Sequence, residues 1–240
     1  MISIIFPTLN EESCIGDSIR LINSKMTLPH EIIVSDGKST DKTVSIAKSL
    51  GAKVVEYAGE KRQNISMGRN AGAAAASGEF LVFMDADSRI PEPDQFFTAA
   101  LKRFDQNGKL VALTAHLRVY PESATVADRI IFGILYFNLR FLNNVLHKGE
   151  STGEFQMIRR STFVSLHGFR EDLITREDAD MFLRLSKVGR TMVDTKLTVF
   201  HSGRRAHKIG WPKLLRQWIT NSIWVVLFNK AHADEWTVVR

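Results

Sequence analysis

The chain has 240 residues, of which 44% are hydrophobic and 24% charged, and its net charge at pH 7 is +6. These values are ordinary for a soluble globular protein and provide enough sequence for one well-cored domain. Because Cys14 is the only cysteine, the sequence excludes an intrachain disulfide and a thiolate-bound metal cluster. The positive charge is concentrated in residues 201–240, which carry a net +5. Such a segment indicates an anionic partner, a diphosphate or a lipid surface, or else a solvated charged face; no nucleic-acid-binding motif accompanies it.

Apolar, β-branched segments alternate with helical segments over the first 91 residues. Four of them predict short buried strands: Ile2–Phe6, Glu31–Ser35, Lys53–Tyr57 and Phe80–Met84. Three helices are expected between these strands, with Gly51 and Gly78 at C-cap positions: Glu11–Lys25, Asp41–Leu50 and Arg62–Ala76. The alternation predicts a Rossmann-like α/β fold with a mainly parallel, doubly wound sheet, whose ligands bind beyond the C-terminal strand ends. Because the chain begins directly in a strand pattern, without a secretory leader, we expect a cytoplasmic protein.

The rest of the chain is predicted to add four helices and three strands. The expected helices are Pro93–Gln106, Thr125–His147, Asp178–Lys187 and Trp211–Asn229. The expected strands are Leu110–Val119, Phe155–Ile158 and Met192–Phe200. We expect one domain over residues 1–203, with halves at 1–91 and 92–203, followed by a basic amphipathic helical region over 204–240.

The final helix combines a polar and an apolar stripe. The polar stripe holds Lys213, Arg216, Gln217, Thr220 and Asn221, and the apolar one Leu214, Leu215, Trp218 and Val225. With Trp211 and Trp224 nearby, this pattern narrowly favours a helix packed on the domain; the alternative is an interfacial helix at the inner face of the cell membrane. The apolar segment Ile130–Val145 falls short of the ~20 residues that a membrane span needs.

Acidic residues follow two of the predicted strands. Asp85 and Asp87 flank one small residue directly after Phe80–Met84. Their carboxylates suit Mg²⁺ or Mn²⁺ and ribose hydroxyls, and a metal there would take up charge on a departing diphosphate. Two exposed acids in a turn are the alternative, but the position after a buried strand favours a ligand site.

The ends of the first two strands carry further polar residues. Asp36 closes the segment Glu31–Ser35 and can accept a hydrogen bond from a base or ribose, whereas Asp41 is expected to act as a helix N-cap. At the end of the first strand, Pro7 and Thr8 reach the same edge of the sheet, and Asn10 is either a ligand contact or a cap.

Together these segments resemble the family 2 glycosyltransferases, which have the GT-A fold. The resemblance covers residues 2 to about 203 and rests on FPTLNEE (6–12), EIIVSDGKSTD (31–41), GRNAGAAAASGEFLVFMDADSRI (68–90), HGF (167–169) and REDAD (176–180). It implies inverting, metal-dependent transfer of a sugar from a UDP- or GDP-sugar to a hydroxyl, on a lipid-linked acceptor if the final helix is interfacial. The halves 1–91 and 92–203 would then bind nucleotide and acceptor. Asp36-Gly37-Lys38 replaces the usual pair of acids before Gly-Ser, so the resemblance does not identify the nucleotide.

The resemblance also implies roles for individual residues in donor binding. Contacts to the nucleotide-sugar are expected from Pro7, Thr8, Asn10, Glu11, Asp36, Arg62, Arg69 and Asp85. Asp87 would bind the metal, with Asp85 shared between metal and ribose and His201 as a third ligand. Surface arginines and a structural histidine are the alternatives for Arg62, Arg69 and His201. Arg204 and Arg205 would hold the diphosphate or the lipid phosphate of an acceptor.

Catalysis is expected at Glu177-Asp178, which heads a predicted helix. Direct displacement needs a carboxylate that removes the proton of the acceptor hydroxyl. By resemblance, Asp178 would be this base and Glu177 an acceptor contact; capping of the helix by Asp178 is the alternative. The glycine-flanked segment Lys148–Gly153 is interpreted as a mobile lid or as an ordinary connection.

Two other functions use some of the same features. A nucleotidyltransferase would need a glycine-rich, basic signature after the first strand, which Phe6–Glu12 lacks. A non-catalytic nucleotide-sugar-binding protein would retain Asp36 and Asp87 but not Asp178. Because the Q-x-x-R-W signature of processive members is missing at Leu214–Trp218, we expect single additions.

Overall fold

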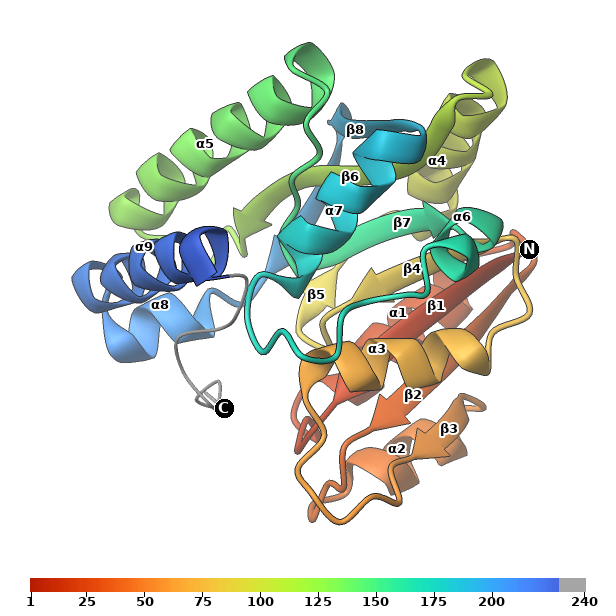
Figure 1. Cartoon of the computed structure of the whole chain (residues 1–240). Helices are drawn as coiled ribbons and strands as arrows, with labels where there is room; N and C mark the ends of the chain where they lie inside the picture. The colour runs from red at the N-terminus through yellow and green to blue at the C-terminus, as the bar shows by residue number, and fades with distance from the viewer. Residues whose placement is uncertain (229–240) are drawn as a thin grey trace.

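A computed structural model describes residues 1–228 and contains one eight-stranded sheet covered by helices on both faces (Figure 1). The strands are β1 (Ile2–Thr8), β2 (His30–Asp36), β3 (Lys53–Glu56), β4 (Phe80–Met84), β5 (Ser88–Arg89), β6 (Leu110–Val119), β7 (Phe155–Arg159) and β8 (Arg190–His201). The helices are α1 (Ile15–Lys25), α2 (Thr43–Ser49), α3 (Ile65–Ala74), α4 (Pro93–Gln106), α5 (Val126–Arg140), α6 (Arg160–Ser165), α7 (Glu177–Val188), α8 (Arg204–Ile209) and α9 (Trp211–Phe228). A π-helical turn over Phe141–Val145 continues α5.

The strand order is β3-β2-β1-β4-β7-β6-β8-β5. The pairs β1–β2, β2–β3, β1–β4 and β6–β8 are parallel, whereas β7 runs antiparallel to both of its neighbours and β5 runs antiparallel to β8. The prediction of a mainly parallel sheet is therefore confirmed for the described residues.

The apolar runs of the central strands are buried on both faces of the sheet. In β4, Phe80, Val82 and Met84 join one core cluster, while Leu81 and Phe83 join the other. The first cluster includes side chains of α1 and α4, and the second includes side chains of α3 and α7. Because successive strand residues point to opposite faces, a strand covered on both sides must be apolar at every position.

Two glycines predicted as C-caps have different roles. Gly51 follows α2 with φ +81°, a conformation that favours glycine, as expected. Gly78 is not a cap, because α3 has already ended with Ala75 in the C-cap position. A Cβ at Gly78 would lie 2.6 Å from the Oγ of Ser3, so glycine there allows the chain to approach β1 closely.

The last helical region contains α8 and α9 as separate helices. The predicted end of the final helix at Asn229 and the rest of the 204–240 region lie outside the described residues. Along α9, Lys213 and Arg216 are exposed as predicted, but Asn221 is buried. No helix within residues 1–228 has the length and apolar character needed to cross a bilayer.

Candidate functional site

A cleft of about 960 Å³ lies beyond the C-terminal ends of β1, β2 and β4. Its polar end is lined by Thr8 of β1, by Ser35 of β2 and the following Gly37, and by Asp85 and Asp87, which come after β4. The start of α7 forms another wall. The opposite end is apolar and lies between α5 and α9, where it is lined by Phe132, Leu135, Leu139, Trp211, Leu214 and Trp218. The cleft thus has one end suited to a polar ligand and one suited to an apolar group.

Most of the predicted site residues line this cleft. They are Pro7, Thr8, Glu11, Arg62, Arg69, Asp85, Asp87, Glu177, Asp178, His201, Arg204 and Arg205. Arg62 does so from the loop before α3 rather than from the helix predicted for it. Asn10 and Asp36 are not among the lining residues, and their contact with a nucleotide stays a prediction.

Asn10 and Asp36 instead hold two loops together. Asn10 has φ +57°, and its Oδ1 accepts a hydrogen bond of 2.8 Å from the backbone N–H of Thr40. Asp36 is buried, and its carboxylate accepts hydrogen bonds from the hydroxyl of Thr8 and from the backbone N–H of Ser39. These contacts tie the loop after β1 to the loop after β2.

Ser35 is a cleft residue that the sequence analysis missed. Its Oγ is buried and has no hydrogen-bond partner within the described part of the chain. An unpartnered buried hydroxyl carries a free-energy cost that a ligand would remove by hydrogen bonding to it. The signal in the sequence was that Ser35 stands where the family pattern has an acid.

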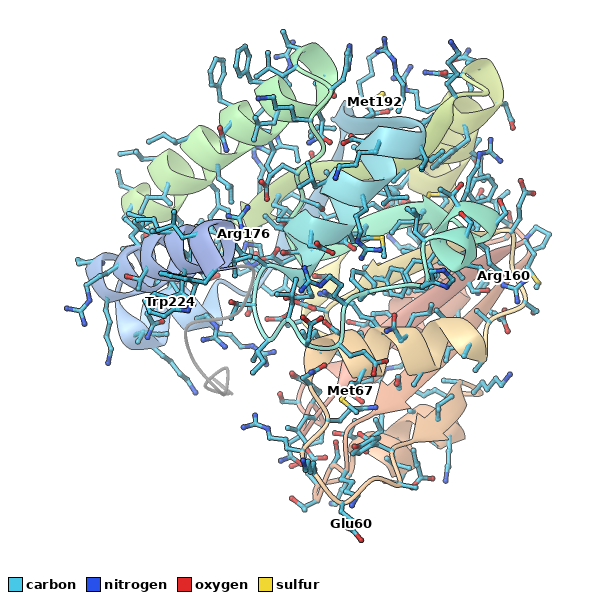
Figure 2. All side chains as sticks on the ribbon, viewed as in Figure 1. Glu60, Met67, Arg160, Arg176, Met192 and Trp224 are labelled. Carbon is cyan, nitrogen blue, oxygen red and sulfur yellow. The ribbon has the colours of Figure 1, made fainter. Side chains whose placement is uncertain are left out.

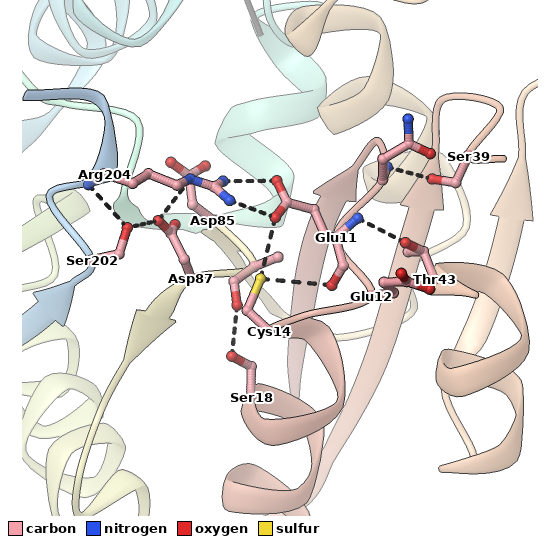
Figure 3. Close-up of polar contacts among 12 residues, drawn as sticks. Glu11, Glu12, Cys14, Ser18, Ser39, Thr43, Asp85, Asp87, Ser202 and Arg204 are labelled. Atoms are coloured by element: carbon pink, nitrogen blue, oxygen red, sulfur yellow. Dashed lines mark hydrogen bonds and ion pairs between the residues drawn. The ribbon is translucent and has the colours of Figure 1, made fainter. Parts of the chain in front are cut away.

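An ion-paired cluster occupies the floor of the cleft beside β4 (Figure 3). Arg204 donates two hydrogen bonds, of 2.8 and 2.7 Å, to the carboxylate of Glu11, and its Nε lies 3.1 Å from Oδ2 of Asp87. The hydroxyl of Ser202 also donates to Asp87. The thiol of Cys14 contacts Glu11, and burial raises the pKa of this thiol to about 12, so it stays protonated. Arg204 thus pairs with both Glu11 and Asp87 in this structure, and its contact with a diphosphate stays a prediction.

Asp85 has a strongly perturbed carboxyl group. Its pKa is raised to about 8, mainly by burial and also by the neighbouring carboxylates of Asp87 and Glu154, against the opposing effect of Arg69 and Arg204. Two carboxylates so close together favour a bound cation. The oxygen donors of Asp85 and Asp87 suit Mg²⁺ or Mn²⁺, with remaining coordination positions open for phosphate oxygens and water.

His201 does not complete a three-residue metal site. Within residues 1–228, no three His, Cys, Asp or Glu side chains are arranged to hold a metal ion. The carboxylate of Asp87 is turned towards Arg204. The Nδ1 of His201 accepts a hydrogen bond of 3.2 Å from the backbone N–H of Gly203, which leaves the proton of a neutral ring on the buried, unpartnered Nε2. In this arrangement His201 presents a hydrogen-bond donor, which suits a phosphate oxygen better than a metal.

Arg69 is the central cation of the cleft and not a surface arginine. Its side chain is 2% exposed, and its Nη1 lies 2.7 Å from a carboxylate oxygen of Glu177. Its Nη2 donates to the carbonyl of Gly153 at 3.0 Å and lies 4.0 Å from Asp85. The guanidinium also lies over the ring of Phe169. Arg69 thereby connects the end of β4 to the start of α7.

Glu177 and Asp178 have different environments although they are neighbours. Glu177 is ion-paired to Arg69, so its geometry suits a positioning role, and the acceptor contact stays a prediction. Asp178 lines the cleft, and Arg176 rather than Asp178 occupies the N-cap position of α7. The pKa of Asp178 is raised well above its usual value, mainly by burial and also by the carboxylate of Glu177, while Arg69 opposes the rise.

The segment Lys148–Gly153 is fastened at several points. The side chain of Asn143 bonds to the backbone carbonyl of Glu150 at 2.7 Å, and the Glu150 carboxylate lies 3.1 Å from Arg176. Arg176, labelled in Figure 2, also donates to the hydroxyl of Ser222 on α9. These contacts fit an ordered wall of the cleft; a lid movement stays a prediction.

The tryptophans of the final helix do not form a common outer belt. Trp211 and Trp218 line the cleft, with their ring centroids 5.9 Å apart. Trp224 lies on the outer side of α9 and is the exposed member of the three (Figure 2). Helical spacing predicted the apolar stripe that includes Trp218, but not that Trp218 lines the cleft.

Comparison with known proteins identifies the family. The model of the family described as "Glycosyl transferase family 2" matches residues 3–166. The chain belongs to glycosyl transferase family 2. Among curated relatives of this glycosyltransferase chain, the glucosyl-3-phosphoglycerate synthase of Petrotoga mobilis is 39% identical over 189 residues, which cover 70% of this chain and 57% of that protein. The dolichyl N-acetyl-alpha-D-glucosaminyl phosphate 3-beta-D-2,3-diacetamido-2,3-dideoxy-beta-D-glucuronosyltransferase of Methanococcus voltae is 30% identical over 210 residues, 78% of this chain and 62% of that protein.

Solved structures confirm the GT-A fold of this family 2 glycosyltransferase. A mannosyltransferase of Pyrobaculum calidifontis in complex with GDP-Man and Mn²⁺ aligns with a TM-score of 0.70 at 19% identity, covering 97% of this chain and 65% of that one. The glucosyl-3-phosphoglycerate synthase of Mycobacterium tuberculosis, in complex with Mn²⁺, UDP and glucosyl-3-phosphoglycerate, aligns with a TM-score of 0.60 at 24% identity, covering 95% of this chain and 78% of that one. This chain spans about 60% of the length of the two curated relatives above.

Proposed function

We propose that this glycosyltransferase moves a sugar from a UDP- or GDP-sugar to a hydroxyl acceptor with inversion at the anomeric carbon. The observation that carries the proposal is that one cleft holds an acidic pair, Asp85 and Asp87, together with a separate carboxylate of raised pKa, Asp178. The first two suit a diphosphate-bound cation, and the third suits a general base. The family membership and the Mn²⁺ complexes of the structural neighbours support this division of roles.

The nucleotide would occupy the polar end of the cleft. Its base and ribose would lie against Pro7, Thr8, Ser35 and Gly37, and the unpartnered hydroxyl of Ser35 would hydrogen-bond to the base. Mg²⁺ or Mn²⁺ bound by Asp85 and Asp87 would neutralise charge on the diphosphate. Other cleft residues near the phosphates would be Arg62, Arg205 and the Nε2–H of His201.

Asp178 would act directly on the acceptor. As the acceptor hydroxyl attacks the anomeric carbon on the face opposite the diphosphate, Asp178 takes its proton and the diphosphate leaves with the electron pair of the broken bond. A raised pKa makes this carboxylate a stronger base. Glu177 fixes Arg69, which in turn holds the carbonyl of Gly153, so the pair would position the cleft wall around the reacting groups.

A lipid-linked acceptor fits the apolar end of the cleft. Side chains such as Trp211 and Trp218 would cover an apolar chain while its polar head reaches Asp178. The name of the Methanococcus voltae relative includes dolichyl N-acetyl-alpha-D-glucosaminyl phosphate, which supports this class of acceptor. We place the enzyme in the cytoplasm, in peripheral contact with the inner face of the cell membrane. Nucleotidyl transfer is disfavoured by the family membership, and mere nucleotide-sugar binding is disfavoured by the environment of Asp178.

Calorimetric titration with UDP, GDP and their sugar conjugates, each with and without Mn²⁺, tests the donor half of the proposal. Wild-type protein is expected to bind one nucleotide with an affinity that Mn²⁺ increases. Asp87→Ala should abolish the effect of Mn²⁺, while Asp105→Ala, at an exposed position on α4, should leave it unchanged. Failure of every nucleotide to bind, or a Mn²⁺ effect that persists in Asp87→Ala, would contradict the assignment.

A further inference from the structure

A continuous apolar row runs along the outer face of α5 and the π-helical turn. It is defined here as the α5 stripe, and its members are between 43% and 71% exposed: Val126, Ile130, Ile134, Phe137, Phe141 and Val145. Their spacing of three or four residues aligns them on one side of a helix. A row of this length spans about 30 Å at the helical rise of 1.5 Å per residue. Monomeric soluble proteins rarely leave so long an apolar face in water, so the α5 stripe indicates a contact surface.

The charged side chains beside the α5 stripe are positive. Arg129 and Arg140 are exposed on α5, and Lys148 is exposed just after the π-helical turn. Between residues 126 and 148 the sequence has one acid, Asp128, which is buried and bonded to the ring of His207. An apolar row flanked by exposed cations has the composition of a helix that lies in the interface of an anionic membrane.

The α5 stripe is also continuous with the apolar end of the cleft. The inner face of the same helix contributes Phe132, Leu135 and Leu139 to the cleft wall. On the other side of that end, α9 exposes further apolar side chains, including Ile219 and Ile223. Figure 1 shows α5 and α9 at the same edge of the molecule, away from α2 and β3.

We propose that the α5 stripe docks on an anionic lipid bilayer and so holds the apolar end of the cleft at the membrane surface. The apolar side chains enter the boundary between headgroups and acyl chains, while Arg129, Arg140 and Lys148 contact lipid phosphates. A second copy of the chain fits this surface less well, because apposed copies of the stripe bring like charges together. The inference rests on the proposed function only for its purpose, the delivery of a lipid-linked acceptor.

Co-sedimentation with vesicles of phosphatidylcholine containing roughly one-third phosphatidylglycerol tests the apolar contact. The double variant Ile134→Ser/Phe137→Ser should lose at least tenfold in vesicle partitioning, since each side chain contributes buried apolar area. A matched control is Val164→Ser/Val188→Ser, which removes apolar side chains of similar exposure, 59% and 56%, from α6 and α7. The control should bind as the wild type does. Equal binding by wild type and the stripe variant would overturn the proposal.

The charge contribution has its own variant and control. Arg129→Gln/Arg140→Gln should weaken binding to the anionic vesicles by about fivefold per charge and leave binding to pure phosphatidylcholine unchanged. Arg160→Gln, at an exposed position on α6, should have no effect (Figure 2). An equal loss in the control and the α5 variant would contradict lipid-phosphate contacts at α5.

Sedimentation velocity without lipid and titration with nucleotide separate this proposal from its rivals. A wild-type dimer that Ile134→Ser/Phe137→Ser converts to a monomer would overturn lipid docking in favour of self-association. A monomer that binds anionic vesicles through the α5 stripe supports the proposal. The stripe variant should bind nucleotide as the wild type does, which shows that it is folded. Vesicle binding by a protein that binds no nucleotide would refute the proposed function and leave membrane docking standing.

Discussion

The buried ion pair between Arg69 and Glu177 makes a quantitative prediction about stability. Its N–O distance is 2.7 Å, and the two side chains are 2% and 9% exposed. Removing one partner of a buried pair typically costs 3–5 kcal/mol, because the other charge is left without compensation. Arg69 would keep the carbonyl of Gly153 at 3.0 Å and Asp85 at 4.0 Å, so we expect Glu177→Ala to cost about 3 kcal/mol.

The pair Lys48–Glu56 provides a matched control for this prediction. Its N–O distance is also 2.7 Å, but its side chains are 57% and 58% exposed. Exposed pairs contribute about 1 kcal/mol or less, so Glu56→Ala should change stability little. Glu177→Gln, which removes the charge and keeps the volume, should fall between wild type and Glu177→Ala.

Thermal unfolding followed by circular dichroism measures the difference. For a domain of this size, 1 kcal/mol corresponds to roughly 2–4 °C in Tm, so Glu177→Ala should unfold about 6–12 °C below wild type. Glu56→Ala should stay within about 4 °C. Equal losses in the two alanine variants would refute the argument that burial of the Arg69 pair decides its contribution.

Three further predictions concern binding and catalysis. Asp178 acts as a base only when deprotonated, and its pKa is raised. As the pH is lowered, kcat/KM should therefore begin to fall at a pH well above the pKa of an ordinary aspartate. A pH–rate profile without this acid limb would contradict the role of Asp178. Ser35→Ala should weaken nucleotide binding about three- to tenfold in a calorimetric titration, the value of one hydrogen bond, and unchanged affinity would exclude that contact. A Cβ at Gly153 would lie 2.6 Å from Nη2 of Arg69, so Gly153→Ala should displace the guanidinium and reduce turnover at least tenfold. Gly108→Ala, at a position with open space around it, should leave turnover unchanged. Equal turnover in the two variants would contradict this prediction.

The sequence predicted the strands of the first half well and the helix starts less well. A strand buried on both faces leaves an uninterrupted apolar run, as in Phe80–Met84, which no surface helix imitates. Helices α1, α2 and α3 begin two to four residues later than predicted. Polar residues in the preceding loops bond across to other loops or cap the helix from outside: Asn10 bonds to Thr40, and Asn64 caps α3 by accepting from the backbone N–H of Met67.

The position of the cleft was predictable, whereas its ion pairs were not. Acids at strand ends share one edge of a parallel sheet, so Asp85 and Asp87 were expected in the cleft that they now line. The partners of Arg69 and Arg204 are 108 and 193 residues away in the chain. Residues so far apart in the chain leave no periodic pattern in the sequence, so the ion pairs of Glu177 and Glu11 with arginines could be found only in the structure. Trp218 likewise lines the cleft together with residues of α5 that are distant in the chain, so its orientation could not be predicted from the sequence.

Sugar transfer by Asp178→Asn tests the central claim most directly. Wild-type protein is incubated with UDP- and GDP-sugars, Mn²⁺ and a hydroxyl acceptor, and release of the nucleoside diphosphate is followed alongside donor affinity. Asp180→Asn is the control, because Asp180 lies on the same helix but pairs with Arg184 outside the cleft. The account predicts that Asp178→Asn keeps donor affinity and loses at least about a hundredfold in turnover, the contribution of a general base, while Asp180→Asn retains activity. Turnover by Asp178→Asn equal to that of the wild type would contradict the account.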